Sequence, residues 1–191
     1  MRQALAAMAV SGLLLAGCSA GGGGDGDDGG AAAPAGGAPG AVADVAAVNE
    51  VLAGLDGVVG DVQRMLVRER RITPEITDRL QAVYTGPELL NQIDAFKIDV
   101  AGGLARYRST PGNRLTVVSR IIGSRPDCLF AEVRRDYSSI SPGPAQPPAD
   151  LYVVLVPKRA ADDPGGHNPT TWAMLYDGVQ ADGSEPENVC V

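Results

Sequence analysis

The hydrophobic residues of this chain change their spacing once, close to residue 111, and this change most constrains the fold. Before that point, apolar residues recur at steps of three and four, as they do along one face of an α-helix. After it, they alternate with polar residues or form short β-branched runs, as they do in β-strands. Helices followed by strands predict an α+β fold, with N-terminal helices packed on an antiparallel sheet of four or more strands.

Three amphipathic helices are predicted before the change in spacing. The apolar stripe of the first consists of Val45, Val48, Leu52, Leu55, Val59, Val62 and Leu66. This spacing also suits a coiled coil, but Gly54, Gly57 and Gly60 would weaken a free-standing helix by about 1 kcal/mol each. We therefore favour a helix packed on a core, and if it is interrupted, the glycines are the expected place.

The second and third helices have recognisable starts. Residues 73–75 provide a hydroxyl N-cap, a proline for the first turn and an acidic side chain next to the positive end of the helix dipole. Residues 85–88 repeat this pattern: Thr85 is the hydroxyl cap, Gly86 breaks the chain, and Pro87 and Glu88 follow. The third helix is expected to fade near residues 102–103.

Four strands are predicted after residue 111, at 115–122, 128–139, 151–156 and 170–177. Residues 124–127 are expected to form a turn between the first two. In the second strand, one side carries Leu129, Ala131, Val133, Arg135 and Tyr137. The third strand is apolar throughout, so we expect it to be central and covered on both faces.

The first residues have the pattern of an export signal. Arg2 precedes an almost uninterrupted apolar run at residues 4–14, which is shorter than the roughly 20 residues that a transmembrane helix needs. The run ends in Leu15-Ala16-Gly17-Cys18, which resembles the lipobox of bacterial lipoproteins. An ordinary signal peptide with an incidental cysteine remains the alternative.

The lipobox resemblance implies the processing and location of the chain. Residues 1–17 would be removed as a signal peptide, and Cys18 would carry a diacylglycerol and often a further fatty acid such as palmitate. Two or three acyl chains give stable anchoring, so the expected location is the extracytoplasmic face of the cell membrane. The membrane would then be a partner through the lipid on Cys18.

The cysteines divide between this anchor and one disulfide. If Cys18 is lipidated, Cys128 and Cys190 remain in an oxidising compartment, which predicts a disulfide between them. The long loop that it closes would give about 4 kcal/mol in the chain-entropy model. Two unpaired thiols are the alternative, and no cysteine or histidine spacing suggests a metal site.

Composition separates a tether from a folded region. Residues 18–40 consist almost entirely of Gly, Ala, Pro and Asp, so they have little to bury, and we interpret them as a flexible tether with a reach of roughly 25 Å. The acidic residues at 25–28 lack the rest of a calcium-loop pattern. Residues 41–191 are predicted to form a single α+β domain.

The order of elements over residues 41–177 resembles that of the NTF2-like superfamily. The strand segments 115–118, 129–133, 151–155 and 171–175 carry the likeness. In that superfamily a bent sheet wraps around a helix to form a cone. Residues 85–90, together with the later Trp172 strand, also resemble uncharacterised exported lipoproteins of high-GC Gram-positive bacteria. A cystatin-like or other α+β sandwich has the same order of elements.

No motif in the sequence indicates catalysis or a cofactor. The formal net charge of -7 makes nucleic acid an unsuitable partner. The single histidine, His167, is predicted to lie in a loop, and no nucleophile elbow or phosphate-binding loop occurs. We therefore predict no catalytic, cofactor-binding or metal-binding residue.

A pocket is nevertheless an open question in this sequence. Its aromatic residues could line one or could pack in the core: Tyr107, Tyr137, Tyr152, Trp172 and Tyr176. Asp94 and Asp99 lie on the third predicted helix, and either could face a cone interior or solvent. A buried phenol beside one carboxylate would be the pairing with a perturbed pKa.

Three functions are compatible with these observations. The first is a non-enzymatic binding or interaction module, whose partner is an envelope protein or a small apolar ligand. The second is a small lyase or isomerase of the NTF2-like kind with a cone-shaped pocket. The third is a structural accessory domain of a cell-envelope assembly. We rank them in this order because the sequence lacks catalytic groups.

Overall fold

The computed structural model describes residues 43–144, 147–179 and 184–190. The predicted signal peptide (1–17), Cys18 and the predicted tether (18–40) therefore lie outside the described residues. Within the described part, three α-helices are followed by a four-stranded antiparallel sheet, so the predicted α+β fold is confirmed.

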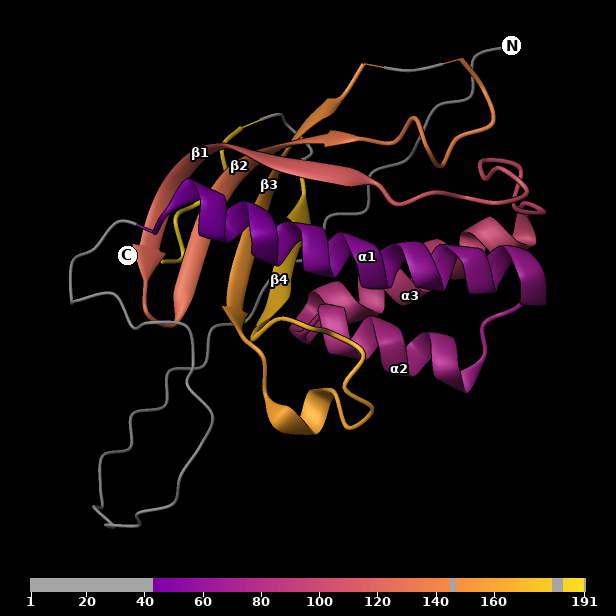
Figure 1. The fold of residues 1–191 in the computed structure, drawn as a ribbon, viewed down its shortest axis with the longest axis horizontal. Helices are drawn as coiled ribbons and strands as arrows, with labels where there is room; N and C mark the ends of the chain where they lie inside the picture. The colour runs from indigo at the N-terminus through magenta and orange to yellow at the C-terminus, as the bar shows by residue number, and fades with distance from the viewer. Residues whose placement is uncertain (1–42, 145–146, 180–183, 191) are drawn as a thin grey trace. The chain divides into compact units, whose positions relative to one another are not determined.

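Figure 1 shows helices α1, α2 and α3. Helices α1 and α2 begin at residues whose side chains cap them, whereas Thr85, the predicted cap of α3, makes no side-chain capping bond. Helix α1 spans Val45–Glu69, and the Asp44 carboxylate accepts a hydrogen bond from the backbone N–H of Ala46. Helix α2 spans Pro74–Val83, and the Thr73 hydroxyl accepts one from the N–H of Ile76. Helix α3 spans Gly86–Ala101. These caps satisfy N–H groups that a helix start would otherwise leave unpaired.

Helix α1 continues through its glycines without interruption. Its buried side chains include most of the predicted stripe, from Val48 to Leu66. A Cβ atom on Gly60 would collide with the side chain of Asn113, whereas one on Gly57 would meet nothing within 4 Å. Because the Asn113 side chain is exposed and can move aside, this contact does not require glycine, and α1 is continuous because burial of its stripe offsets the low helix propensity of glycine.

The sheet is a simple meander. Its strands are β1 (Leu115–Arg125), β2 (Cys128–Asp136), β3 (Ala149–Pro157) and β4 (Trp172–Gly178), in the order β1-β2-β3-β4, and each neighbour is antiparallel. Only Pro126 and Asp127 separate β1 from β2, within the predicted turn. The 3₁₀-helix η1 (Ala160–Asp162) lies in the loop before β4. Two register shifts in β1 mark bulges, which bend a strand.

The sheet has an apolar cluster on each face. The larger core contains Leu129, Ala131 and Val133 of β2 together with side chains of the helices. On the other face, Phe130 and Val154 pack with Cys190 of the C-terminal segment. Because Val153 and Leu155 belong to the first cluster and Val154 to the second, β3 is covered on both faces, as its apolar sequence predicts.

Candidate functional site

Four buried charged side chains meet between the helices and the sheet. Asp56 comes from α1, Arg114 directly precedes β1, Arg135 lies on β2 and Asp177 lies on β4. None of these side chains is more than 6% exposed. We call this set the charge network. It contains two guanidinium groups and two carboxylates, so its formal charge is balanced.

Asp56 connects α1 to the start of the sheet. Its Oδ1 accepts a hydrogen bond from Arg114 Nε at 2.6 Å, and its Oδ2 accepts one from the backbone N–H of Thr116 at 2.8 Å. Position 56 adjoins the apolar stripe of α1, so the fold of the helix itself carries this carboxylate into the interior. Both carboxylate oxygens are thereby satisfied.

Asp177 connects β4 to both arginines. Its Oδ1 lies 2.6 Å from Arg135 Nη1, and its Oδ2 lies 3.4 Å from Arg114 Nη1 and from the Tyr84 hydroxyl. Burial by itself raises the pKa of Asp177, but Arg114 and Arg135 outweigh burial and hold this pKa below its usual value. Asp177 therefore stays ionised. Burial raises the pKa of Tyr84, which stays a neutral phenol.

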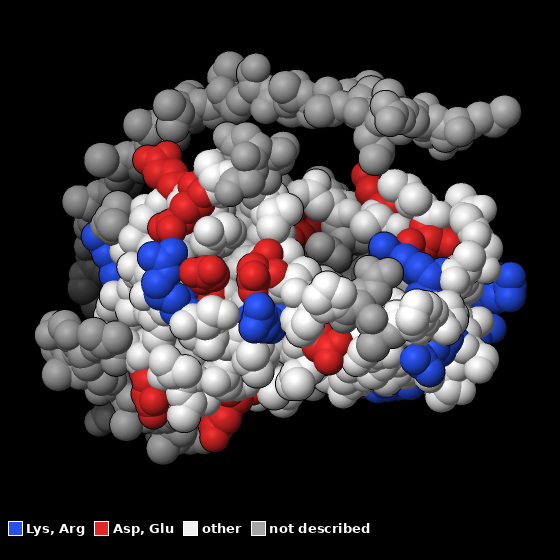
Figure 2. Space-filling model, turned by 90° about the horizontal axis from the view of Figure 1, so that it is seen from above, with Lys and Arg blue, Asp and Glu red and all other residues white. Residues whose placement is uncertain are grey.

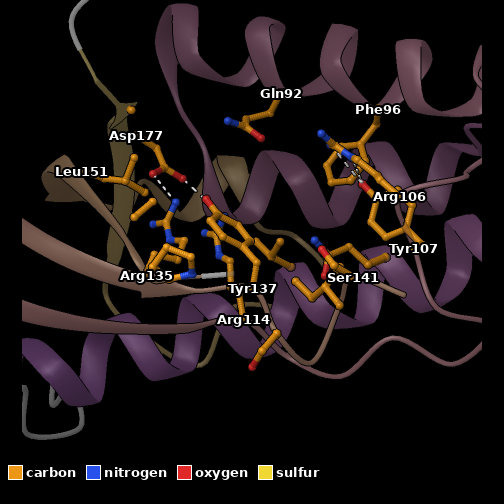
Figure 3. A pocket seen from close by; sticks show the side chains of 17 residues that line it. Gln92, Phe96, Arg106, Tyr107, Arg114, Arg135, Tyr137, Ser141, Leu151 and Asp177 are labelled. Carbon is orange, nitrogen blue, oxygen red and sulfur yellow. Dashed lines mark hydrogen bonds and ion pairs between the residues drawn. The ribbon is translucent and has the colours of Figure 1, made fainter. Parts of the chain in front are cut away.

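A pocket of about 500 Å³ opens beside the charge network. Figure 3 shows Arg135 and Asp177 at one end, Arg106 and Tyr107 at the other, and Phe96 of α3 on the wall. The volume falls within the usual range for small-molecule sites, and such sites combine apolar walls with a few polar groups.

Two buried polar atoms of residues that line this pocket have no hydrogen-bond partner among the described residues. One is Nη2 of Arg135, whose side chain is 2% exposed. The other is Oε1 of Gln63, a residue of α1 that is 7% exposed. An unpaired buried polar group costs about 1–3 kcal/mol. Both atoms have almost no accessible surface, so they lie inside the wall and are not presented to the pocket.

A second polar group lines the far end of the pocket. The Tyr107 hydroxyl donates a hydrogen bond to Asp99 Oδ2 at 2.5 Å, and Arg106 pairs with the same carboxylate oxygen. Burial, together with the hydrogen bond to Asp99, raises the pKa of Tyr107. This is the pairing of a phenol with a carboxylate that the sequence raises as a question, and it involves Asp99. Asp94 instead lies exposed and pairs with Lys97.

The remaining aromatic candidates divide between two regions. Tyr137 lines the pocket with Tyr107, whereas Trp172 packs at the margin of the main core. Tyr152 and Tyr176 lie on the other face of the sheet, against the cluster that contains Cys190. His167 lies in the predicted loop, where its backbone N–H donates to Asp163 at 2.7 Å.

Most of the site was not identified from the sequence. Of the charge network, only Arg135 had a visible signal, since it follows Leu129, Ala131 and Val133 on the buried side of β2. A charged residue in a buried alternation requires a buried partner. The sequence does not say that this partner is Asp177, which is distant along the chain.

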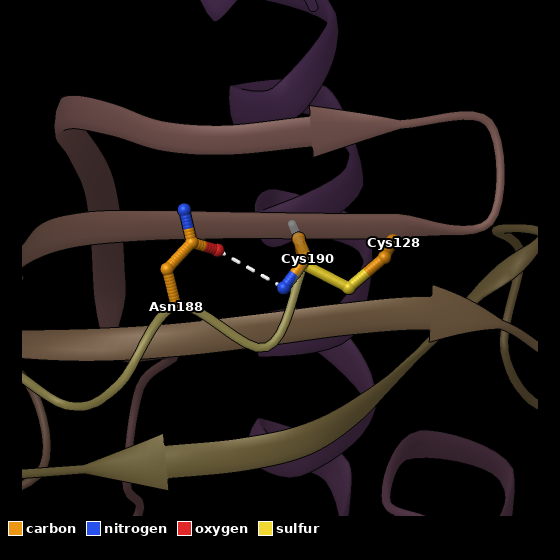
Figure 4. Close-up of a disulfide and its surroundings, with 3 residues drawn as sticks. All are labelled: Cys128, Asn188 and Cys190. Atoms are coloured by element: carbon orange, nitrogen blue, oxygen red, sulfur yellow. Dashed lines mark hydrogen bonds between the residues drawn. A yellow bond between two sulfur atoms is a disulfide. The ribbon is translucent and has the colours of Figure 1, made fainter.

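The predicted disulfide is present. Cys128, at the start of β2, and Cys190 are bonded, with their Cα atoms 5.4 Å apart. Figure 4 shows the bond on the face of the sheet opposite α1, where the backbone N–H of Cys190 also donates to Asn188 at 3.0 Å. The disulfide therefore fixes the C-terminal segment on the outer face and away from the pocket.

The described helices and clusters give two further results. Within the described ranges, no helix is long and apolar enough to cross a membrane. In the same part of the chain, no three His, Cys, Asp or Glu side chains gather as they would around a metal ion.

The chain matches no protein-family model, no curated protein and no solved structure.

Proposed function

We propose that this chain is a lipoprotein of the extracytoplasmic membrane face, anchored through Cys18, whose α+β domain binds a small molecule without catalysing its conversion. The observation that carries the binding function is the pocket of about 500 Å³, whose lining combines apolar side chains such as Phe96 and Leu151 with a few polar ones. The lipobox at residues 15–18 supports the location.

The carboxylates at the pocket are already paired with other side chains, which fits binding better than catalysis. A lyase or isomerase of the NTF2-like kind would need a free base in the pocket. Asp99 Oδ2 already accepts from Tyr107 and pairs with Arg106, and Asp177 pairs with both arginines of the charge network. Each of these carboxylates is thus already paired with an arginine and a phenol, and neither is a free base.

A pocket-filling substitution tests the proposal. Ala149 lines the pocket and pairs with Arg135 across the sheet, so its side chain shares the inner face. Ala149→Trp should fill the pocket. Asp150→Trp is the matched control, because the next residue on a strand points to the opposite face.

The measurement is the small-molecule content of the full-length lipoprotein, purified from membranes in mild detergent, denatured and analysed by mass spectrometry. We expect a near-stoichiometric small molecule with the wild-type chain and with Asp150→Trp, but not with Ala149→Trp. Equal recovery from all three chains, or no bound molecule in any, would contradict the proposal.

A structural accessory role is the second candidate, and it rests on α3. Leu90 and Ile98 of this helix are 65% and 71% exposed, and their spacing of eight residues places them on one side of it. If α3 contacts an envelope partner, these two side chains would belong to the contact surface. If they hold an envelope partner, Leu90→Ser with Ile98→Ser should abolish in-cell cross-links from this face, while ligand content stays unchanged.

A further inference from the structure

We propose that the domain rests on an anionic membrane surface through one end, formed by residues 61–71 at the C-terminus of α1 and by the loop at residues 102–113. We call this region the basic end. The inference rests on the proposed anchoring through Cys18 and deepens it, because it gives the tethered domain an orientation. It follows from the distribution of charge, the exposure of the arginines and the length of the tether.

The basic end is rich in arginine. Its two segments contain six arginines and two acids. The segments lie in direct contact, since Arg64 of α1 donates a hydrogen bond to Asn113 of the loop at 2.9 Å. If Arg79 of α2 and the neighbouring acids of α2 and α3 are included, this end has seven arginines and five acids. Positive charge is therefore in excess.

The rest of the described chain has the opposite sign, with eight basic and fourteen acidic side chains. On the face shown in Figure 2, basic side chains prevail at the right, where Figure 1 places the end of α1, and acidic ones prevail at the left. The domain therefore has an electrostatic polarity along the direction of α1.

The arginines of the basic end are accessible. The side chains of Arg68 and Arg106 are 66% and 62% exposed. Arg70, Arg71 and Arg108 are also exposed, and none of these three pairs with a carboxylate in the described part of the chain. A guanidinium group can hold a phosphate group through two parallel N–H···O bonds, so these side chains suit the phosphodiester groups of lipids.

The helix dipole does not account for this set of arginines. A cation in the last turn of a helix is stabilised by the dipole, and Arg68 of α1 is such a residue. That effect falls off within one turn, so it gives no reason for Arg108 in the loop. Arg108 donates to the carbonyl oxygens of Ser138 and Ser141, which leaves its charge uncompensated.

The acidic net charge of the chain does not prevent contact with an anionic surface. Charges that lie farther from the headgroups than the Debye length, about 8 Å at physiological ionic strength, are largely screened. The sign of the interaction is therefore decided by the end that touches the membrane. Near an anionic surface, each arginine strengthens binding about fivefold.

The tether allows the basic end to reach the membrane. It joins the domain at the opposite end of α1, a helix of 25 residues that is about 37 Å long. Residues 18–42 span up to about 80 Å when fully extended. Anchoring also holds the domain at an effective concentration on the order of mM near the membrane. Weak contacts with headgroups are then sufficient to orient it.

Flotation with vesicles tests the basic end without the anchor. The full mature chain with Cys18→Ala is mixed with vesicles of phosphatidylcholine alone, or of phosphatidylcholine with phosphatidylglycerol. We expect the chain to float only with the anionic vesicles and to be released in about 1 M salt, where the Debye length is about 3 Å. Equal flotation with both kinds of vesicle, or with neither, would overturn the proposal.

Two matched double variants locate the contact. Arg70→Gln with Arg71→Gln should lower the partition onto anionic vesicles roughly twenty- to thirtyfold, at about fivefold for each arginine. Arg125→Gln with Arg159→Gln removes the same charge at the other end of the sheet, where β1 ends and β3 has just ended, and should leave the partition unaltered. Equal losses in both double variants would refute a contact through the basic end.

The remaining outcomes separate the membrane from free phosphate and this proposal from the anchor. Inorganic phosphate that shifts the Arg70 and Arg71 Nε–Hε NMR signals, without any flotation on anionic vesicles, would overturn the membrane as the partner. Flotation of the Cys18→Ala chain supports the basic end even if Cys18 proves not to carry lipid. Failure to float overturns the basic end even if Cys18 is lipidated.

Discussion

Replacement of Asp177 by asparagine should destabilise the domain strongly. The substitution keeps the size of the side chain but removes the charge that Arg135 Nη1 meets at 2.6 Å, in a pair whose side chains are both 2% exposed. Arg114 keeps Asp56 as a partner. Arg135 keeps its bond to Thr116, and its Nη1 can still donate to the asparagine amide oxygen, but no carboxylate partner remains. The result is a buried guanidinium group without a counter-charge.

The expected loss in free energy of unfolding is about 3–5 kcal/mol, the usual cost of removing one member of a buried ion pair. For a domain of this size, that corresponds to a fall in Tm of about 6–20 °C. Urea unfolding at pH 7, followed by the fluorescence of the single tryptophan, Trp172, measures the loss. The control is Asp150→Asn, because Asp150 pairs with Arg134 at the surface, where their side chains are 60% and 58% exposed. That change should have no measurable effect.

The same variant should show a weaker dependence of stability on pH. The folded-state pKa of Asp177 lies below its value in the unfolded chain, about 3.9. Its contribution is therefore complete above that pH and is lost as the pH falls through the folded-state pKa. The advantage of the wild type over Asp177→Asn should shrink below about pH 4. A loss under about 1 kcal/mol at pH 7, or an advantage that grows in acid, would refute the electrostatic argument.

Three other changes test separate parts of the structure. Gly57→Ala should stabilise α1 by about 0.5–1 kcal/mol, since a Cβ there meets nothing. Gly60→Ala should stabilise less than Gly57→Ala, because its Cβ must displace the Asn113 side chain from its hydrogen bond with Arg64, and urea unfolding of both variants gives the comparison. Cys190→Ser opens the disulfide and should cost up to about 4 kcal/mol, with reduced wild-type protein showing the same loss in a urea titration. Cys18→Ala should abolish metabolic labelling with a palmitate analogue, and retained labelling would exclude this residue as the lipid site.

Local signals account for the part of the fold that the sequence predicts. The caps at Thr73 and the proline after it define the start of α2, and the alternation in β2 assigns Leu129, Ala131 and Val133 to the core. The number of cysteines, with Cys18 assigned to the lipid, predicted the pairing of Cys128 with Cys190. Each of these signals lies within a few residues or depends on composition alone.

The site was less predictable because it depends on which elements meet. Asp56 and Asp177 look like ordinary acids of a helix and of a strand end, and only the folded arrangement brings both to Arg114. The continuity of α1 likewise depends on tertiary packing and not on local sequence. Propensity favours a break at its glycines, whereas burial of its apolar stripe in the core keeps the helix continuous.

The charge network also predicts how the domain opens. It links α1, the first helix, to β4, the last strand, through Arg114 and Arg135. Neither element can detach alone without leaving a buried charge unpaired, so fluctuations that release one should release the other. Native-state hydrogen exchange should therefore find the amides of α1 near Asp56 and those of β4 near Asp177 opening with the same free energy. The two elements would form one cooperative unit despite their separation along the chain.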